Sequence, residues 1–287
     1  MVLHIMKYRK IAYWVSGILV ALSVFLLAFR GLNYGIDFSG GISMEVTPIE
    51  QSYTIDKMRS DLSEFKPELQ QVDGKSILIR LGLPKDATDA QQNERVSEIK
   101  DILGNKVEYS QVQIVGPKIG GELVRGGILA ILFAFVMMAI YVWIRYKGGY
   151  AIGAFVSLFL DFILMFGFFS ATGLEFNQTA IAVILTGIGY SINDKVVNYD
   201  RIDENVKKYH KMPMADLIDL SVSEMFRRTM LTSVSTLLAM IGLLLFGGVM
   251  LRDFALAMGF SVIMGTFTSI FISNMILYNF NLRDTDK

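Results

Sequence analysis

Cysteine is absent from this sequence of 287 residues, and histidine occurs only twice, as His4 and His210. The absence of cysteine excludes a disulfide framework, a thiolate metal site and a cysteine nucleophile. The two histidines lie far apart in the sequence, and no group of other candidate ligands surrounds either of them. The sequence therefore predicts no metal site.

Nucleotide-binding and hydrolase motifs are also missing. The chain contains no G-x-x-x-x-G-K-[ST] P-loop and no G-x-S-x-G nucleophile elbow. Its 27 basic and 27 acidic side chains balance to a net charge of zero, which gives no electrostatic reason to expect nucleic acid as a partner. We expect a protein that is not an enzyme, binds no cofactor and draws the energy for any work from elsewhere.

Hydrophobic residues, in contrast, make up 53% of the chain, and its mean hydropathy is +0.45. Runs near or above the roughly 20 residues that cross a bilayer recur along it. They predict an α-helical polytopic membrane protein with six transmembrane helices. The first run is too long for a signal-peptide core and no A-x-A-like site follows it, so we expect a retained anchor. The runs are Ile11–Phe29, Val124–Ile144, Tyr150–Ala171, Thr179–Tyr199, Thr229–Phe246 and Phe254–Phe280.

The charges of the connecting segments predict the orientation. Lysine and arginine precede the first run and gather after the second and fourth runs, whereas the other short connections carry at most one. The positive-inside rule then places both termini in the cytoplasm. We expect a cytoplasmic loop near residues 200–228, within which the amphipathic stretch Ala215–Met225 forms a short interfacial helix.

The polar segment between the first and second runs is expected to fold outside the cytoplasm. Its pattern is strand, helix, strand, strand, helix, strand, which is typical of a ferredoxin-like α+β domain. We expect a domain over residues 31–123, between an anchor over 1–30 and a membrane part over 124–287. The elements are strands Ile42–Val46, Leu69–Val72, Ser76–Leu81 and Val107–Val115, helix Thr54–Phe65 capped by Thr54 or Ser52, a turn at Asp73-Gly74, and helix Asp89–Leu103 ended by Gly104.

Ionisable residues inside the fourth run are the strongest functional signal. The segment Thr186–Arg201 carries Asp194 and Lys195. A charged side chain near the middle of a membrane helix costs about 2.5–3.5 kcal/mol on insertion scales, so such residues face protein or a wet cavity. Helical spacing gives this segment a polar seam. The seam and its neighbours comprise Gly187, Tyr190, Asn193, Asp194, Lys195, Asn198 and Arg201.

Two further charged residues also lie within or at the start of apolar runs. Arg228 opens the fifth run and begins a second seam that includes Thr232, while Asp161 lies near the centre of the third run. Facing seams that carry a carboxylate and a guanidinium suit a polar path between helices. Alternatives stay open: Asp194 could cap or snorkel beside Lys195, Arg228 could be a positive-inside anchor, and Asp161 could only hydrogen-bond across helices.

Glycine-rich segments flank the outside domain and are easiest to understand as hinges. One spans 31–41 and the other 116–127; their glycines include Gly35, Gly40, Gly41, Gly116, Gly120 and Gly121. On the last run, Ser261, Gly265, Ser269 and Ser273 repeat every four residues, which predicts close helix packing.

Together these segments resemble the SecF branch of the SecD/SecF family of bacterial protein-export proteins, within the RND superfamily. The similar motifs are GIDFSGG at 35–41, GPKIGGEL at 116–123, GYSINDKVVNYDR at 189–201 and RTMLTS at 228–233. They cover essentially the whole chain in the family's order. The chain departs from the family pattern in that Lys195 follows the aspartate directly and Asp203 stands where a basic residue is common.

The resemblance implies half of an RND-type fold, completed by a SecD-like subunit in the bacterial inner membrane. It implies that proton flow moves the periplasmic domain and so helps a preprotein leave the SecY-E-G channel, with YajC and YidC as further partners. It assigns a proton relay to Asp194 and Arg228, to which we add Asp161. The alternative is an RND-type small-molecule or lipid exporter half-subunit, although such exporters usually carry larger outside domains; a non-transporting assembly factor would not need these charges.

Overall fold

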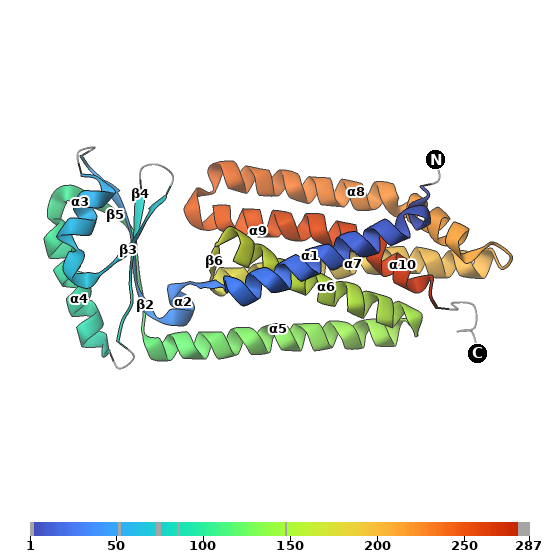
Figure 1. Cartoon of the computed structure of the whole chain (residues 1–287), viewed down its shortest axis with the longest axis horizontal. Helices are drawn as coiled ribbons and strands as arrows, with labels where there is room; N and C mark the ends of the chain where they lie inside the picture. The colour runs from blue at the N-terminus through green and yellow to red at the C-terminus, as the bar shows by residue number, and fades with distance from the viewer. Residues whose placement is uncertain (1–2, 51–52, 73–75, 85–86, 147, 281–287) are drawn as a thin grey trace. The chain divides into compact units, whose positions relative to one another are not determined.

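The structure is a computed structural model that describes residues 3–50, 53–72, 76–84, 87–146 and 148–280 (Figure 1). It divides into two compact units. A helical unit comprises residues 1–33, 130–175 and 179–287, and a second unit comprises 34–129 with 176–178. Three positions named from the sequence, Ser52, Asp73 and Gly74, lie outside the described residues.

The predicted six membrane spans are confirmed, since six helices are long and apolar enough to cross a bilayer. The last span is formed by three consecutive pieces, with a five-residue π-helix between two α-helices. The helices are α1 (Arg9–Phe29, preceded by a 3-10 turn at Ile5–Tyr8), α5 (Pro117–Arg145), α6 (Gly149–Thr172), α7 (Gln178–Lys208), α8 (Met214–Phe246), α9 (Gly248–Phe267), the π-helix η4 (Thr268–Ile272) and α10 (Ser273–Leu277).

Two of these helices are longer than their apolar runs, which corrects the expected loop near 200–228. Helix α7 continues to Lys208 and α8 begins at Met214, so the connection between them is only residues 209–213. The stretch Ala215–Met225 is the start of α8 and not a separate interfacial helix. Its polar side chains are used between the two helices, because Arg201 binds Glu224 at 2.7 Å.

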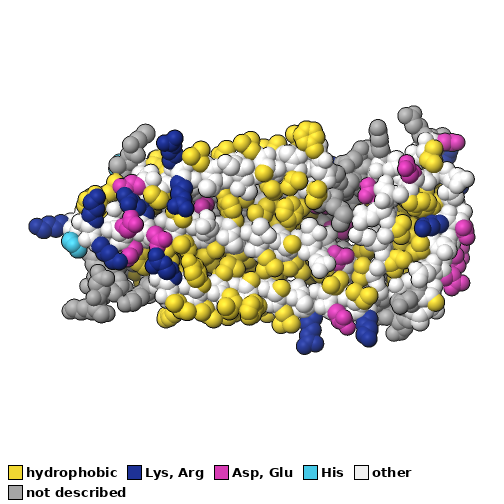
Figure 2. Space-filling view, turned by 180° about the vertical axis from the view of Figure 1, so that it is seen from behind, with side chains coloured by type: hydrophobic (Ala, Val, Ile, Leu, Met, Phe, Trp, Pro, Cys, Tyr) yellow, Lys and Arg dark blue, Asp and Glu magenta, His cyan; other side chains and the backbone are white. Residues whose placement is uncertain are grey.

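The helical unit leaves much apolar surface uncovered. Trp14 on α1, Phe133 on α5 and Phe246 on α8 are 74%, 69% and 87% exposed. Apolar side chains cover the middle of this unit, and charged side chains gather at the end that holds the chain termini (Figure 2). This distribution matches an apolar band in lipid with a charged end in the adjoining aqueous layer.

The second unit is the ferredoxin-like domain predicted from the sequence, and the structure confirms it. Strands β2 (Gly41–Pro48), β3 (Glu68–Val72), β4 (Ser76–Leu81) and β5 (Val107–Val115) form one antiparallel sheet in the order β3-β4-β2-β5. Helices α3 (Ile55–Asp61) and α4 (Asp89–Leu103) bury their apolar residues against it, with the short 3-10 turns η2 (Ser63–Phe65) and η3 (Gly104–Lys106) at their ends.

Strand pairing, helix capping and side-chain hydrogen bonds stabilise this domain. Met44 on the central strand lies opposite Ile79 on one side and Val112 on the other. Thr88 and Gln91 form a reciprocal capping box at the start of α4, which satisfies backbone N–H groups that the helix leaves free. Asp61 accepts hydrogen bonds from Tyr53 and from Lys106, and these lower the pKa of its carboxyl group.

The first glycine-rich segment is tied to the connection between α6 and α7. The Gly35 N–H donates to the Phe176 carbonyl at 3.0 Å, and the Gln178 N–H donates to the Asp37 carboxylate at 3.1 Å. All four residues belong to the second unit. Short strands β1 (Asn33–Tyr34) and β6 (Glu175–Phe176) pair here, and the one-turn helix α2 (Ile36–Ser39) follows.

The second glycine-rich segment is not an irregular hinge, because α5 is helical from Pro117 onward. Gly120 and Gly121 therefore lie within a helix, and Gly116 immediately precedes it. A side chain at Gly120 would approach the Phe38 carbonyl oxygen to 3.1 Å. Glycine is needed there for close packing of α5 on the first segment. In that first segment, Gly40 and Gly41 have φ angles of 72° and 156°, which side chains disfavour.

Candidate functional site in the membrane helices

Asp194 projects from α7 into the helical unit and is 4% exposed. Among the described residues, its side chain makes no hydrogen bond and no ion pair, and its Oδ2 atom is buried without a partner. Buried polar atoms are nearly always hydrogen-bonded, and each exception calls for an explanation. An unpaired acid inside a membrane helix is therefore a candidate functional group.

Arg228 does not form an ion pair with Asp194 within 4.0 Å in the part of the chain that the structure describes. It lies in α8 on the exposed surface of the helical unit. The acid and the base of the expected relay are thus present on neighbouring spans of the chain, but they are not in direct contact in this conformation.

The structure brings Lys195 to Asp161 and not to Asp194, which corrects the neighbour pairing considered from the sequence. The Lys195 Nζ atom is 2.8 Å from the Asp161 carboxylate, and its side chain is fully buried. Lys195 and Asp194 are adjacent on a helix, where successive side chains point about 100° apart and do not face each other. Lys195 consequently reaches Asp161 on α6.

Two hydroxyl groups complete the cluster around this ion pair. Ser191 donates to Asp161 at 2.6 Å, and Thr268 donates to the other carboxylate oxygen, also at 2.6 Å. Lys195 in turn donates to the oxygens of Ser191 and Thr268, the latter at 3.2 Å. Each group has a partner, so the cluster joins α6, α7 and the π-helix of the last span.

Thr268 is the first residue of the π-helix η4. Its five residues, Thr268–Ile272, carry an extra residue in the turn, a rare geometry that occurs mostly at functional sites. The following Ser269 accepts, through its carbonyl oxygen, hydrogen bonds from Asn198 at 3.4 Å and from Asn274 at 2.9 Å. These amides occupy backbone acceptors at the irregular turn.

The remaining seam residues fall into two sets. The Tyr190 hydroxyl donates to Ser233 at 3.2 Å, and Ser233 shares a 2.7 Å hydrogen bond with Thr266, which joins α7, α8 and α9. Asn193 and Thr232, in contrast, are exposed. Thr232 bonds to the Thr229 carbonyl of its own helix at 2.9 Å. The structure thus separates the polar residues of α7 and α8 into buried links and an outward-facing set.

The small residues of the last span pack closely, as predicted. A side chain added at Gly187 would collide with Ser261, and one at Gly265 would approach the Ser191 Cβ atom to 3.1 Å. Ser269 donates to the Ser191 carbonyl at 3.3 Å. Close approach of α7 to α9 therefore depends on residues without bulky side chains.

Sequence reasoning missed Ser191 and Thr268 as members of the buried cluster. Ser191 precedes Lys195 by four residues and so shares its helix face, a signal that was available from spacing. Thr268 could not be found this way, because it lies in another span, and spacing within α7 does not show which residues of that span face Lys195. Among the residues that the structure describes, no group of three or more His, Cys, Asp or Glu side chains could hold a metal ion.

These features define a polytopic membrane protein with ionisable groups buried between its helices and one ferredoxin-like domain between its first two spans. Comparison with known proteins identifies the family. The family model described as "Protein export membrane protein SecD/SecF, C-terminal" matches residues 95–283, and that of the "SecD/SecF GG Motif" matches 25–48. The chain belongs to the SecD/SecF family of protein-export membrane proteins.

Relatives and solved structures agree with this assignment. The chain is 39% identical to "Protein translocase subunit SecF" of Rickettsia felis and 40% identical to that of Rickettsia bellii, covering 98% of this chain and 93% and 94% of the relatives. It is similar, at 31% identity and a TM-score of 0.85, to the crystal structure of SecDF from Thermus thermophilus, a translocon-associated membrane protein. A SecDF structure in a "super-membrane-facing form" matches at 30% identity and a TM-score of 0.72.

Both structural matches cover nearly all of this chain but less than half of the SecDF chain. The Thermus match covers 96% of this chain and 38% of the SecDF chain, and the other covers 99% and 39%. The chain therefore spans less than half the length of the SecDF proteins it resembles.

Proposed function

We propose that this chain works with a SecD-like subunit in the bacterial inner membrane, with both termini cytoplasmic, and uses the proton-motive force to drive late steps of protein export. The observation that carries the proposal is the buried Asp194 carboxylate, which has no partner in the described part of the chain. A carboxylate of this kind can take up and release a proton without first breaking an ion pair.

Arg228 and Asp161 have different places in the proposed relay. Arg228 lies on the outward surface of the helical unit. A SecD-like subunit that covers this surface would contact Arg228, and protons that enter between the two subunits would pass beside it. Asp161 is the counter-ion of Lys195, the residue next to Asp194 in the chain. A change of charge at Asp194 therefore acts on the field around a buried ion pair whose hydrogen-bonded cluster joins three helices.

The outward-facing polar set supports a partner within the membrane. Asn193 exposes an amide that has no side-chain hydrogen bond among described residues, and Arg228 exposes a guanidinium. Facing lipid would be costly for both groups. A SecD-like half that covers them would satisfy these groups and complete the polar path. This chain's similarity to part of the longer SecDF chain supports the same arrangement.

Covalent continuity supplies a route from the relay to the periplasmic domain. Helix α7 begins at Gln178, which belongs to the ferredoxin-like unit and donates to Asp37. Asp194 lies sixteen residues further along the same helix, about 24 Å at the usual rise. A proton crossing 100 mV releases about 2.3 kcal/mol, enough to bias a domain between two states a few kcal/mol apart. The exported preprotein, the SecY-E-G channel, YajC and YidC are the partners proposed for this motion.

The test is proton conductance by this chain and its SecD-like partner in liposomes. Asp194→Asn keeps the size of the side chain but cannot carry a proton, so we expect it to abolish conductance and the stimulation of export. Asp203→Asn is the matched control, because Asp203 lies on the same helix in an i,i+4 pair with Lys207. Full conductance and export by the Asp194→Asn variant would reject the proposal.

A further inference from the structure

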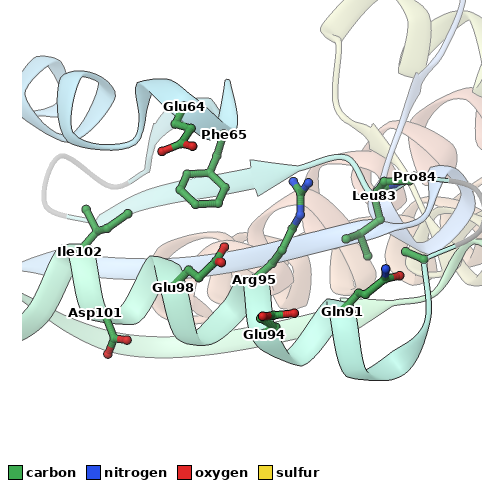
Figure 3. Close-up of a pocket in the computed structure, with 11 residues that line it drawn as sticks. Glu64, Phe65, Leu83, Pro84, Gln91, Glu94, Arg95, Glu98, Asp101 and Ile102 are labelled. Atoms are coloured by element: carbon green, nitrogen blue, oxygen red, sulfur yellow. The ribbon is translucent and has the colours of Figure 1, made fainter.

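The ferredoxin-like domain has a groove of about 930 Å³ that lies along α4. One wall is the face of α4 that carries Gln91, Arg95 and Glu98, and the other includes Phe65 from η2 (Figure 3). The segment after β4, with Leu83 and Pro84, closes one end. The groove lies within one unit and is separate from the charged cluster of the membrane helices.

The length of the groove fits an extended peptide. Gln91, Arg95, Glu98 and Ile102 follow one another at helical spacing along a single face of α4. Eleven residue steps separate the first from the last, which is about 16 Å at 1.5 Å per residue. An extended polypeptide rises about 3.3 Å per residue, so this face accommodates roughly five residues.

The groove offers apolar surface between its charged rims. Phe65, Leu83 and Ile102 are half-buried and pack against the core of the domain. The exposed parts of these side chains line the groove. They provide apolar contacts for side chains of a bound segment, and burial of such surface is the main favourable contribution to most peptide binding.

The charge of the groove selects the kind of segment. In the part of the chain that the structure describes, four acidic side chains and one basic one, Arg95, line it. Among described residues, the acidic Glu64, Glu94 and Glu98 make no hydrogen bond and no ion pair with their side chains. This excess of negative charge disfavours acidic peptides and anionic lipids and favours a ligand that carries lysine or arginine.

We propose that this groove binds a short extended polypeptide segment in which apolar side chains are interspersed with lysine or arginine. The apolar side chains lie on Phe65, Leu83 and Ile102, and the basic ones meet the free glutamates. Arg95 extends across the groove (Figure 3), where its N–H groups can donate to carbonyl oxygens of the extended backbone. The inference rests on the proposed export function, because an exported chain supplies such unfolded segments.

The test measures binding of a labelled peptide to the full chain in nanodiscs of zwitterionic lipid without a proton gradient. A peptide of alternating leucine and lysine is expected to bind, with affinity falling as salt is raised. Alternating leucine–glutamate and serine–lysine peptides are expected to bind at least tenfold more weakly. Equal binding of the three peptides, or no binding of the leucine–lysine peptide, would overturn the proposal.

Substitutions inside and outside the groove test whether the peptide binds there. Glu94→Gln with Glu98→Gln removes two rim charges, so we expect a loss in affinity of about tenfold. Glu108→Gln, an exposed position on β5 outside the groove, is expected to bind as wild type does. If the double variant binds unchanged, or if the groove serves instead as a contact between copies whose concentration-dependent dimer the double variant abolishes, the proposal is wrong.

The outcome is separable from that of the proton-relay experiment. Asp194→Asn is expected to leave peptide binding unchanged, because no proton gradient is applied and the groove lies in the other unit. A chain that conducts protons and supports export but binds no peptide would contradict the groove proposal alone. Peptide binding by a chain pair whose proton conductance does not depend on Asp194 would contradict the relay alone.

Discussion

Two aspartates in neighbouring membrane helices have opposite environments. Asp161 receives hydrogen bonds from Ser191, Lys195 and Thr268, whereas the Asp194 side chain has no partner among the described residues. A fully satisfied buried network fixes the helices that it joins, and an unsatisfied group is free to change its partner or charge. The two residues therefore differ in their surroundings although both are acids within membrane spans.

Loss of one member of the buried ion pair should destabilise the helical unit. We expect Asp161→Asn or Lys195→Met alone to cost about 3–5 kcal/mol, because each leaves an uncompensated buried charge. The double variant leaves no charge and is expected to recover most of the loss. Thermal unfolding of the purified chain in detergent measures the three variants. Single variants as stable as wild type would show that the pair does not hold the helices together.

The sequence could not reveal this pairing. It identified Asp161, Asp194 and Lys195 as residues that need partners, because hydropathy shows which charges lie inside apolar runs. It suggested Lys195 as the partner of Asp194 because the two are adjacent. Side-chain direction and helix contacts decide the matter, and these depend on how α6 and the π-helix pack, which spacing within one helix does not determine.

Among whole helices, glycine and serine positions set how closely α7 and α9 approach. Gly187 faces Ser261, whereas an added Cβ at Gly189 would meet nothing within 4 Å. The small-residue repeat on the last span was recognisable from sequence, and its packing role is confirmed. The full lengths of α7 and α8 could not be recognised from the sequence, because hydropathy marks only the apolar part of a helix and not its charged continuation.

A methyl group at Gly187 should therefore force α7 and α9 apart. We expect Gly187→Ala to destabilise the purified chain by about 1–3 kcal/mol through overpacking, measured as a fall in the midpoint of thermal unfolding. Gly189→Ala is the control on the same helix and should be neutral or slightly stabilising, because alanine favours helix. Adding Ser261→Gly should restore the Gly187→Ala variant; failure of this rescue would place the strain elsewhere.

The whole molecule combines two units that the sequence distinguished by pattern alone. Alternating strand signals and helix caps identified the ferredoxin-like domain, and long apolar runs identified the spans. Both are regular, local features, so they were predictable. The inclusion of residues 176–178 in the ferredoxin-like unit was not, because it depends on contacts with residues 35–38 that are far away in the chain.

The polar outward face of α8 leads to a prediction about assembly. Ser235 is exposed on α8, three residues after Thr232. If the SecD-like partner covers this face, Ser235→Trp should block docking and reduce co-purification of the partner. Leu132→Trp is the control, since Leu132 is 56% exposed on α5 and a tryptophan there replaces one apolar side chain by another. Unchanged recovery of the partner with Ser235→Trp would exclude this face as the contact surface.

The irregular turn in the last span has one more consequence. A π-helical turn holds one residue more than the α-helical path around it, and that surplus amounts to a rotation of about 100° in the residues beyond it. Returning Thr268–Ile272 to regular α-helix would therefore turn α10 about its axis and move Ser273 and Asn274 onto different faces. The backbone geometry of these five residues therefore decides which side chains of α10 pack against α6.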